Sequence, residues 1–312
     1  MLAHALHNIT MWVVHQCFIG SPQRALDGGG PHVLPAHRSR GTVLPMHRCD
    51  ATRFRMAPHL IQQVYERLGV QPPQTLDEMS TLLQAVNRRI PSGNSTKLEA
   101  LQEGKRPPGE DPAVVARRWL DDPGASWTCW ARATLVCALL ADGGWPAHVR
   151  MARRWGPRRT EVDAHAVVRL DGGGQQAILD PHFNLGPLQP DAGGQSRAGM
   201  WGEAVSVGGR VQLLYWSTLW ASNLLYNLWS VDMTPADVAM WLRISRVFTG
   251  VDDTPMWRAG IDQGEVLLRL VRPGWLVMRQ TYDEDPFKAA CTESRVFEQL
   301  DDARRLFERW WA

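Results

Sequence analysis

Residues 162–180 read VDAHAVVRLDGGGQQAILD, and this stretch holds the pattern that decides the fold. The segment 162–170 is rich in β-branched and small apolar residues, and a second apolar run covers residues 175–180. Between them lies Asp171-Gly172-Gly173-Gly174, a strong turn signal. The sequence therefore predicts a β-hairpin with strands at 162–170 and 175–180.

The register of this hairpin predicts a contact between two chemically active side chains. If residues 171–174 form the loop, Leu170 pairs with Gln175 and His165 lies opposite Asp180. Directly opposed residues of an antiparallel pair share one face, with β-carbons about 5 Å apart. We therefore expect the Asp180 carboxylate to orient the His165 imidazole.

A cysteine upstream of the hairpin is expected at the start of a helix. Ser126-Trp127-Thr128-Cys129 comes before an apolar-periodic run that ends at Asp142-Gly143-Gly144, a helix stop. Cys129 would then lie in the first turn. There, unpaired backbone amides and the positive end of the helix dipole favour the thiolate, which is the nucleophilic form.

Taken singly, Cys129, His165 and Asp180 are each compatible with a purely structural role. Together they supply a nucleophile, a base and a group that orients the base, in one compact segment. We interpret Cys129, His165 and Asp180 as a catalytic triad for thiol-dependent acyl transfer.

The composition predicts a globular chain without nucleic-acid or membrane partners. The chain has 312 residues, 44% of them hydrophobic, which is enough for a large core. Its 34 basic and 32 acidic residues give a net charge of +2, which favours neither nucleic acid nor an anionic membrane. The uncharged segment 211–230 is too polar for a membrane span and is interpreted as strands.

Cysteine and histidine positions argue against disulfides and metals. The five Cys residues are scattered without a C-x-x-C pair, so we expect neither a disulfide framework nor structural zinc. His4 and His7 lie one helical turn apart but lack a third ligand, so no metal site is expected. The N-terminus makes a poor signal peptide. Together these features favour a cytoplasmic location.

We expect four regions along the chain. Residues 1–55 read as an N-terminal extension with little order, and residues 56–145 as a helical domain that carries Cys129. This helical domain includes helices around Leu60–Leu68 and after Thr75, a loop at 93–111 and a helix at 113–120. Residues 146–232 read as a β-barrel-like domain that carries His165 and Asp180.

Residues 233–312 read as a C-terminal α/β region. A helix is expected to begin at Thr234-Pro235, and strands are expected at 265–269 and 275–279 around Arg272-Pro273-Gly274. The chain is expected to end in one amphipathic helix, capped by Thr292 or Ser294, with these residues on its apolar face: Val296, Phe297, Leu300, Ala303, Phe307 and Trp310.

From about Met56 onward, the chain resembles the arylamine N-acetyltransferase family. Tyr65-Glu66-Arg67-Leu68-Gly69 followed by Thr75-Leu76 looks like the opening helices of that family, and Ile90-Pro91-Ser92-Gly93-Asn94 is similar to its Ile-Pro-Phe-Glu-Asn segment. On this resemblance Cys129 matches the nucleophile, His165 the base and Asp180 the third member. It implies an α+β fold with an N-terminal helical bundle, a central antiparallel β-barrel and a C-terminal α/β lid.

The chain departs from the family pattern around these residues. The family has Arg-Gly-Gly-x-Cys-Phe-Glu where this chain has Ala125 to Ala131, so the Arg is absent at Ala125. The Glu before the Asn is absent at Gly93. The family has Asp-Val-Gly-Phe-Gly where this chain has Asp180-Pro181-His182-Phe183-Asn184. Cys129-Trp130 and Asp180-Pro181 also resemble the wider transglutaminase-like, papain-like cysteine superfamily.

The resemblance implies an N-acyltransferase that uses acetyl-CoA or another acyl thioester as co-substrate and a small-molecule amine as acceptor. No tightly bound cofactor is expected. An acyl or peptidyl carrier protein is an alternative donor. Two other functions stay open: a transglutaminase-like amide synthase or amidase in a biosynthetic pathway, and an inactive binding module.

A thioester donor with phosphates would need cationic contacts. The sequence offers five arginines around the Gly156-Pro157 turn for this role: Arg150, Arg153, Arg154, Arg158 and Arg159.

Overall fold

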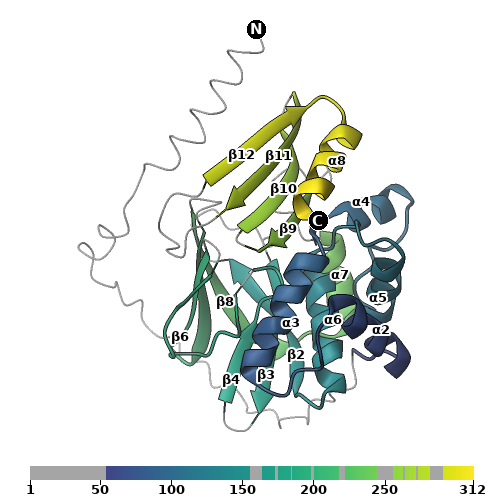
Figure 1. The fold of residues 1–312 in the computed structure, drawn as a ribbon. Coiled ribbons are helices and arrows are strands. Elements are labelled where there is room, and N and C mark those ends of the chain that lie inside the picture. The colour runs from purple at the N-terminus through teal and green to yellow at the C-terminus, as the bar shows by residue number, and fades with distance from the viewer. Residues whose placement is uncertain are drawn as a thin grey trace, which may run out of the picture. The chain divides into compact units, whose positions relative to one another are not determined.

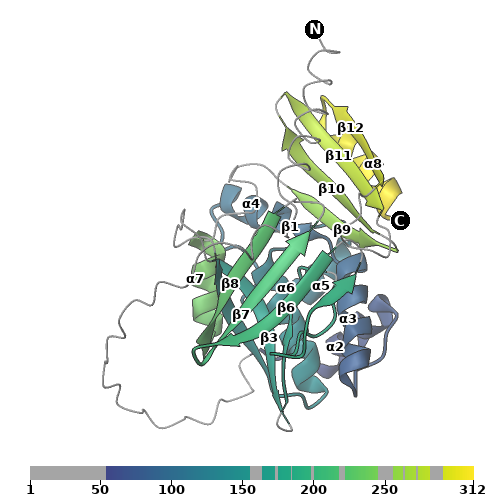
Figure 2. The ribbon, with the colours of Figure 1, turned by 90° about the vertical axis from the view of Figure 1, so that its left-hand side faces the viewer.

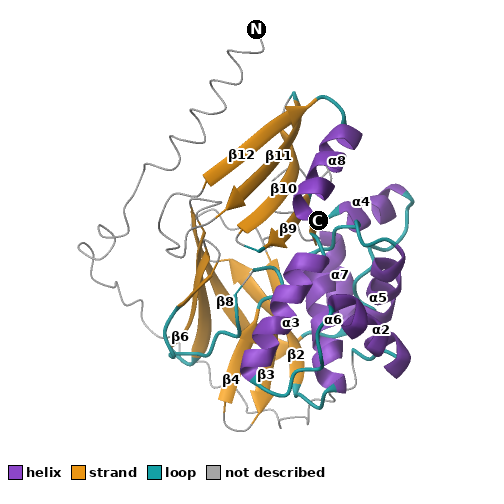
Figure 3. Cartoon of the chain, viewed as in Figure 1, coloured by secondary structure: helices purple, strands orange, loops and turns teal. Residues whose placement is uncertain are grey.

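The computed structural model describes residues 54–154, 164–172, 175–183, 185–197, 200–217, 222–244, 256–262, 264–271, 273–281 and 291–312. These residues belong to one compact unit that spans residues 50–312. Within the unit, a group of helices lies beside one antiparallel sheet, and a second sheet carries the C-terminal helix (Figure 1). Figure 3 separates the helices from the strands.

The first helices form where the sequence predicts them. Helix α2 (Pro58–Leu68) begins with Pro58 in its first turn and ends at Gly69, whose φ of 69° is the left-handed conformation that glycine adopts without steric cost. Helix α3 (Leu76–Arg89) begins with a reciprocal capping box between Thr75 and Glu78. Local sequence alone is sufficient to fix both boundaries.

The predicted loop at 93–111 is partly helical, so that prediction is wrong in its first half. Helix α4 (Ser95–Gln102) lies there, followed by α5 (Pro112–Asp121), which Asp111 caps. Helix α4 has no side-chain cap, and its amphipathic pattern is weak. Its first turn is held by tertiary hydrogen bonds instead, because the backbone N–H and hydroxyl of Thr96 both donate to the carbonyl of Ser126.

The larger sheet has seven antiparallel strands and is open. Its order is β4-β3-β2-β8-β7-β6-β5, and helix α6 (Cys129–Asp142) packs on β2 and β3. Figure 2 shows the strands in front, with α5 and α6 behind them. The strand bounds are β2 Ala147–Arg154, β3 Ala164–Gly172, β4 Gln175–Leu179, β5 Gln195–Arg197, β6 Met200–Val207, β7 Arg210–Ser217 and β8 Ser222–Asp232.

The prediction of a central β-barrel is therefore wrong, because the described strands form an open sheet that does not close into a barrel. Strand β4 is at one edge of the sheet and β5 at the other. The outer edge of β4 is occupied by the connection that follows it, since Ile178 and Leu188 exchange two backbone hydrogen bonds of 2.8 Å. This bridge covers the strand edge that a closing strand would need.

The β3–β4 hairpin forms, but its register differs from the predicted one. Gly172 pairs with Gln175 and Val168 with Leu179, so Leu170 faces Ala177 and not Gln175. The prediction was wrong because Asp171 and Gly172 continue the strand, which leaves a two-residue connection of the commonest hairpin length. The slip is two residues, and side chains alternate with period two, so every residue keeps its predicted face.

The second sheet has five strands in the order β1-β9-β10-β11-β12. Strands β10 (Gly264–Val271) and β11 (Gly274–Thr281) confirm the predicted strand pair, and helix α7 (Pro235–Ile244) confirms the helix expected after Thr234. Helix α8 packs on β10 and β11. The remaining bounds are β1 Ser92–Gly93, β9 Trp257–Ile261, β12 Cys291–Phe297 and α8 Leu300–Trp311.

The prediction of one long C-terminal helix is wrong, because the structure has a strand there followed by a shorter helix. Val296 and Phe297 belong to β12, which pairs along its whole length with β11, and Gln299 is the N-cap of α8 in place of Thr292 or Ser294. Backbone pairing to the exposed edge of β11 outweighs the helical periodicity of this short segment. The helix itself buries Ala303, Leu306 and Phe307, as its apolar face requires.

No helix in the described part of the chain is long and apolar enough to cross a membrane. The uncharged segment 211–230 contributes instead to β7 and β8, as the sequence predicts.

The short strand β1 joins the helical region to the C-terminal sheet. Ser92 pairs with Arg258 and Gly93 with Trp257, and Ser92 also forms a parallel bridge to Trp127, two residues before Cys129. The space beside Gly93 is filled, because a β-carbon there would lie 1.9 Å from the Met256 carbonyl oxygen. Close backbone approach therefore requires glycine at this position.

We predict that Gly93→Ala lowers the free energy of unfolding by about 1–3 kcal/mol, because the added methyl group forces the Met256 segment away. Gly143→Ala is the matched control. Its β-carbon would lie 3.4 Å from the nearest atom, the Leu140 carbonyl oxygen. The control should change stability by less than about 0.5 kcal/mol. Chemical denaturation measures both, and equal losses would contradict the packing argument.

Candidate active site

Cys129 is the first residue of α6, as predicted. Thr128 is the N-cap, and its hydroxyl accepts the backbone N–H of Ala131 at 3.3 Å. The residues from Trp130 to Leu140 are all buried, whereas Cys129 keeps partial exposure. The core therefore fixes the helix on every side, and the thiol at its start remains within reach of a substrate.

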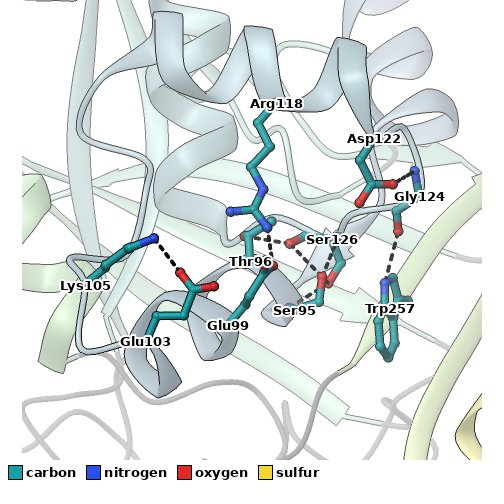
Figure 4. A network of polar contacts seen from close by, with 10 residues as sticks. All are labelled: Ser95, Thr96, Glu99, Glu103, Lys105, Arg118, Asp122, Gly124, Ser126 and Trp257. Carbon is teal, nitrogen blue, oxygen red and sulfur yellow. Dashed lines mark hydrogen bonds and ion pairs between the residues drawn. The ribbon is translucent and has the colours of Figure 1, made fainter.

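The segment that leads into Cys129 is fixed by a network of hydroxyl groups (Figure 4). The Ser126 hydroxyl donates to the Met256 carbonyl at 2.8 Å and accepts the backbone N–H of Ser95 at 2.9 Å. In return, the Ser126 backbone N–H donates to the Ser95 hydroxyl at 2.8 Å. Trp127 adds two backbone hydrogen bonds, to Pro91 and from Gly93. The segment that leads into Cys129 is thus anchored on both sides.

His165 and Asp180 are in direct contact. The Nε2 atom of His165 lies 2.7 Å from Oδ2 of Asp180, and the two side chains are only 3% and 2% exposed. His165 is on β3, opposite Ala152 of β2, and Asp180 directly follows β4. The observed register places Asp180 diagonally across from His165 on the same face of the sheet. The predicted contact therefore forms even though the predicted pairing was wrong by two residues.

The Asp180 carboxylate is oriented by its own turn. Its Oδ1 atom accepts the backbone N–H of His182 at 2.9 Å, and its backbone carbonyl accepts the N–H of Phe183 at 3.2 Å. With Oδ1 engaged in this way, Oδ2 is directed to the imidazole. The turn that follows β4 is therefore what aims the carboxylate.

The local charges favour a protonated His165. Burial by itself lowers the pKa of His165, but the negative charges of Asp180 and Cys129, together with hydrogen bonds to both side chains, outweigh burial and raise the pKa to about 10. The imidazole therefore interacts with the carboxylate and the thiol at once. At neutral pH the imidazole of His165 is therefore protonated.

A second histidine, which sequence reasoning did not single out as a site residue, packs on the first. The ring of His182 meets that of His165 edge to face, with centroids 5.6 Å apart. Burial, with the positive charges of Arg258, His165 and Arg132, holds the pKa of His182 well below its usual range. His182 stands where the family pattern has Gly, and that departure was the available signal.

Two buried arginines also adjoin the site without having been predicted. Arg132 lies one turn after Cys129 on α6, and Arg258 on β9 forms a bidentate ion pair with Glu265. Arg258 also lies over the Phe183 ring, 5.6 Å from its centroid. A charged residue within the otherwise apolar α6 was the sequence signal for Arg132.

The arginines expected to contact phosphates differ in their surroundings and in whether the structure describes them. Arg150 is buried and forms an ion pair of 2.7 Å with Asp232, so the structure contradicts the expectation that it is available for phosphates. Arg153 is half-buried on β2, and no side-chain position is described for Arg154. Arg158 and Arg159 lie outside the described residues, as do His4 and His7. Among the described residues, no group of three His, Cys, Asp or Glu side chains is arranged to hold a metal ion.

Comparison with known proteins is informative at the level of structure only. No protein-family model matches the sequence, and no curated protein matches it either. Solved structures do match, and they include several arylamine N-acetyltransferases. The enzyme from Salmonella typhimurium superimposes with a TM-score of 0.62 at 16% identity, covering 81% of this chain and 90% of that one.

Two further solved arylamine N-acetyltransferase structures also superimpose on this chain. The Nocardia farcinica enzyme gives a TM-score of 0.60 at 16% identity, covering 80% of this chain and 88% of that one. The Mycobacterium marinum enzyme in complex with CoA gives 0.58 at 16% identity, covering 80% and 98%. This chain therefore has the arylamine N-acetyltransferase fold.

We predict that the two histidines in ring contact differ in charge at pH 7, with His165 protonated and His182 neutral. The NMR chemical shifts of the imidazole nitrogens would report both states. Asp180→Asn should lower the pKa of His165 by about 1 to 3 pH units, because burial remains while the opposing charge is lost.

Asp171→Asn is the control, since Asp171 pairs with Arg169 at 2.6 Å near the far end of the same strand. An unchanged His165 titration in Asp180→Asn, or an equal change in the control, would contradict the assigned electrostatics.

Proposed function

We propose that this protein is a divergent member of the arylamine N-acetyltransferase family and transfers an acyl group from a thioester to an amine through Cys129. The observation that carries the proposal is the contact of His165 with both Asp180 and Cys129 on this fold. These three side chains supply the nucleophile, the proton carrier and the orienting carboxylate that covalent acyl transfer requires.

The first half-reaction acylates the enzyme. The Cys129 thiolate attacks the thioester carbonyl, and a carbon–sulfur bond forms to Cys129. The bond to the donor sulfur then breaks, and the His165 imidazolium gives its proton to the departing thiolate. The backbone N–H of Cys129 belongs to the first turn of α6, where such groups are free to stabilise the oxyanion.

The second half-reaction regenerates the enzyme. The amine nitrogen attacks the acyl-Cys129 carbonyl, and neutral His165 accepts the proton that this nitrogen loses. The bond from the carbonyl to Cys129 breaks, which restores the thiolate beside the imidazolium. Asp180 holds the ring in one orientation through both steps because its hydrogen bond to Nε2 leaves the other nitrogen for the thiol and the substrates.

The donor is proposed to be acetyl-CoA or a related acyl thioester. One solved structure with this fold is described as a complex with CoA, which supports a thioester donor. Because the family's Arg and Glu near the nucleophile are replaced here by Ala125 and Gly93, an acyl group on a carrier protein is kept as a second donor class. A transglutaminase-like amide synthase would use that donor.

We predict that incubation with acetyl-CoA adds the mass of one acetyl group to the intact protein and that Cys129→Ala abolishes the adduct. Cys137→Ala is the matched control, because burial raises the pKa of the Cys137 thiol to about 12 and leaves it protonated and inert. A parallel incubation with an acylated carrier protein separates the two donor classes. Absence of an adduct with both donors would refute the proposal.

We predict that His165→Ala slows acylation of Cys129 by about 10²–10⁴-fold, the usual contribution of a general acid–base group. His148→Ala is the control. It lies on β2 and interacts with Asp232 at 3.4 Å. The rate of adduct formation, followed by mass spectrometry over time, measures both variants. A wild-type rate in His165→Ala would remove His165 from the mechanism.

A further inference from the structure

Arg132 is a buried charge one turn beyond the proposed nucleophile. It lies three residues after Cys129 on α6 and is 1% exposed. Its neighbours on the same helix, Ala131 and Ala133, are fully buried. An arginine in such a position loses nearly all of its hydration, which costs several kcal/mol unless other groups compensate it. Its partners therefore indicate what it does.

Asn87 holds the Arg132 side chain and connects it to the turn that carries Asp180. The Nη2 atom of Arg132 donates to Oδ1 of Asn87 at 3.0 Å. The Nδ2 atom of Asn87 donates to the Phe183 carbonyl at 2.9 Å and to the Leu83 carbonyl at 3.0 Å. One chain of hydrogen bonds thus joins the nucleophile helix, α3 and the turn that aims the carboxylate.

The charges in this region balance only when Arg132 is counted. The groups that act electrostatically on Arg132 are Arg258, Asp180, Cys129 and Glu265. Arg258 and Glu265 neutralise each other in their buried ion pair. A thiolate at Cys129 and a carboxylate at Asp180 share the single positive charge of His165, which leaves one negative charge over. Arg132 supplies the charge that offsets it.

Arg132 keeps its charge at neutral pH. Burial, aided by Arg258, lowers its pKa to about 9, while Asp180, Cys129 and Glu265 act in the opposite direction. His182, the other titratable group that Arg132 influences, stays neutral, since burial, Arg258, His165 and Arg132 all lower its pKa. At neutral pH the guanidinium is thus a cation, and it lies beside two groups that must be anionic for catalysis.

We propose that Arg132 is a positioning residue of the active site, which fixes the Asp180 turn through Asn87 and whose buried positive charge stabilises the Cys129 thiolate. The inference rests on the proposed role of Cys129 as the nucleophile. It assigns to this chain a fourth charged member of the site, beyond the thiol, the imidazole and the carboxylate.

The test measures ionisation of the thiol without any acyl donor. Cys129 is alkylated with iodoacetamide across a pH series, and the modified Cys129 peptide is quantified by mass spectrometry, so that the other four cysteines do not interfere. Arg132→Met and Arg132→Gln remove the charge, and Gln retains polar groups that can hydrogen-bond. Arg132→Lys keeps the charge. Thermal unfolding identifies the variants that are folded.

We expect the midpoint of the Cys129 alkylation profile to move to higher pH by about one unit or more in Arg132→Gln and Arg132→Met, and by less in Arg132→Lys. Arg150→Met is the matched control, because it also removes the charge of a buried arginine, in this case one that forms an ion pair with Asp232. The control should leave the midpoint in place even if it lowers stability.

Wild-type midpoints in the folded Gln or Met variant, or an equal displacement in Arg150→Met, would overturn the inference. If Arg132→Met does not fold, Arg132→Gln decides, since it conserves more of the polar contact. The outcome is separable from that of acyl transfer. A protein that shows the displaced midpoint but takes no acyl group would refute the proposed function while supporting the role of Arg132.

Discussion

The buried contact between His165 and Asp180 is the constraint on which the arrangement of the site depends. Two ionisable side chains that are almost fully excluded from water are tolerated only when their charges and hydrogen bonds are matched. The matching comes from elements distant in sequence: β3 presents the imidazole, the turn after β4 aims the carboxylate, and the start of α6 brings the thiol. Packing of α6 on β2 and β3 is therefore what brings Cys129 to the His165–Asp180 pair.

The segment that precedes Cys129 is held by neutral groups at positions where the related family pattern has charged residues. Gly93 and Ala125 stand in place of Glu and Arg, and the volume beside Gly93 is taken by the Met256 backbone and the Ser126 hydroxyl. The Ser126 and Ser95 hydroxyls then supply directional hydrogen bonds without any charge to desolvate.

The sequence predicted the helices, the strands and the His165–Asp180 contact better than it predicted how the strands combine into sheets. Capping signals located α2, α3 and α6, and period-two alternation kept His165 and Asp180 on one face even though the pairing was wrong by two residues. Residues 95–102 were missed because α4 is held by contacts to Ser126 and not by its own pattern. Closure of the sheet and the strand at 291–297 depend on which backbone edges are already paired, and local sequence does not encode that information.

The roles of Arg132 and His182 likewise depend on tertiary neighbours that local sequence does not encode. Each departs from its local pattern, but the departure alone does not show which charged groups lie beside it in the fold. Burial, with the positive charges of Arg258, His165 and Arg132, keeps His182 neutral although its ring packs against the charged imidazole of His165. That neutrality matters, because a second imidazolium would compete with His165 for Asp180 and Cys129. The buried cations therefore keep His182 neutral, which leaves His165 as the protonated imidazole of the pair.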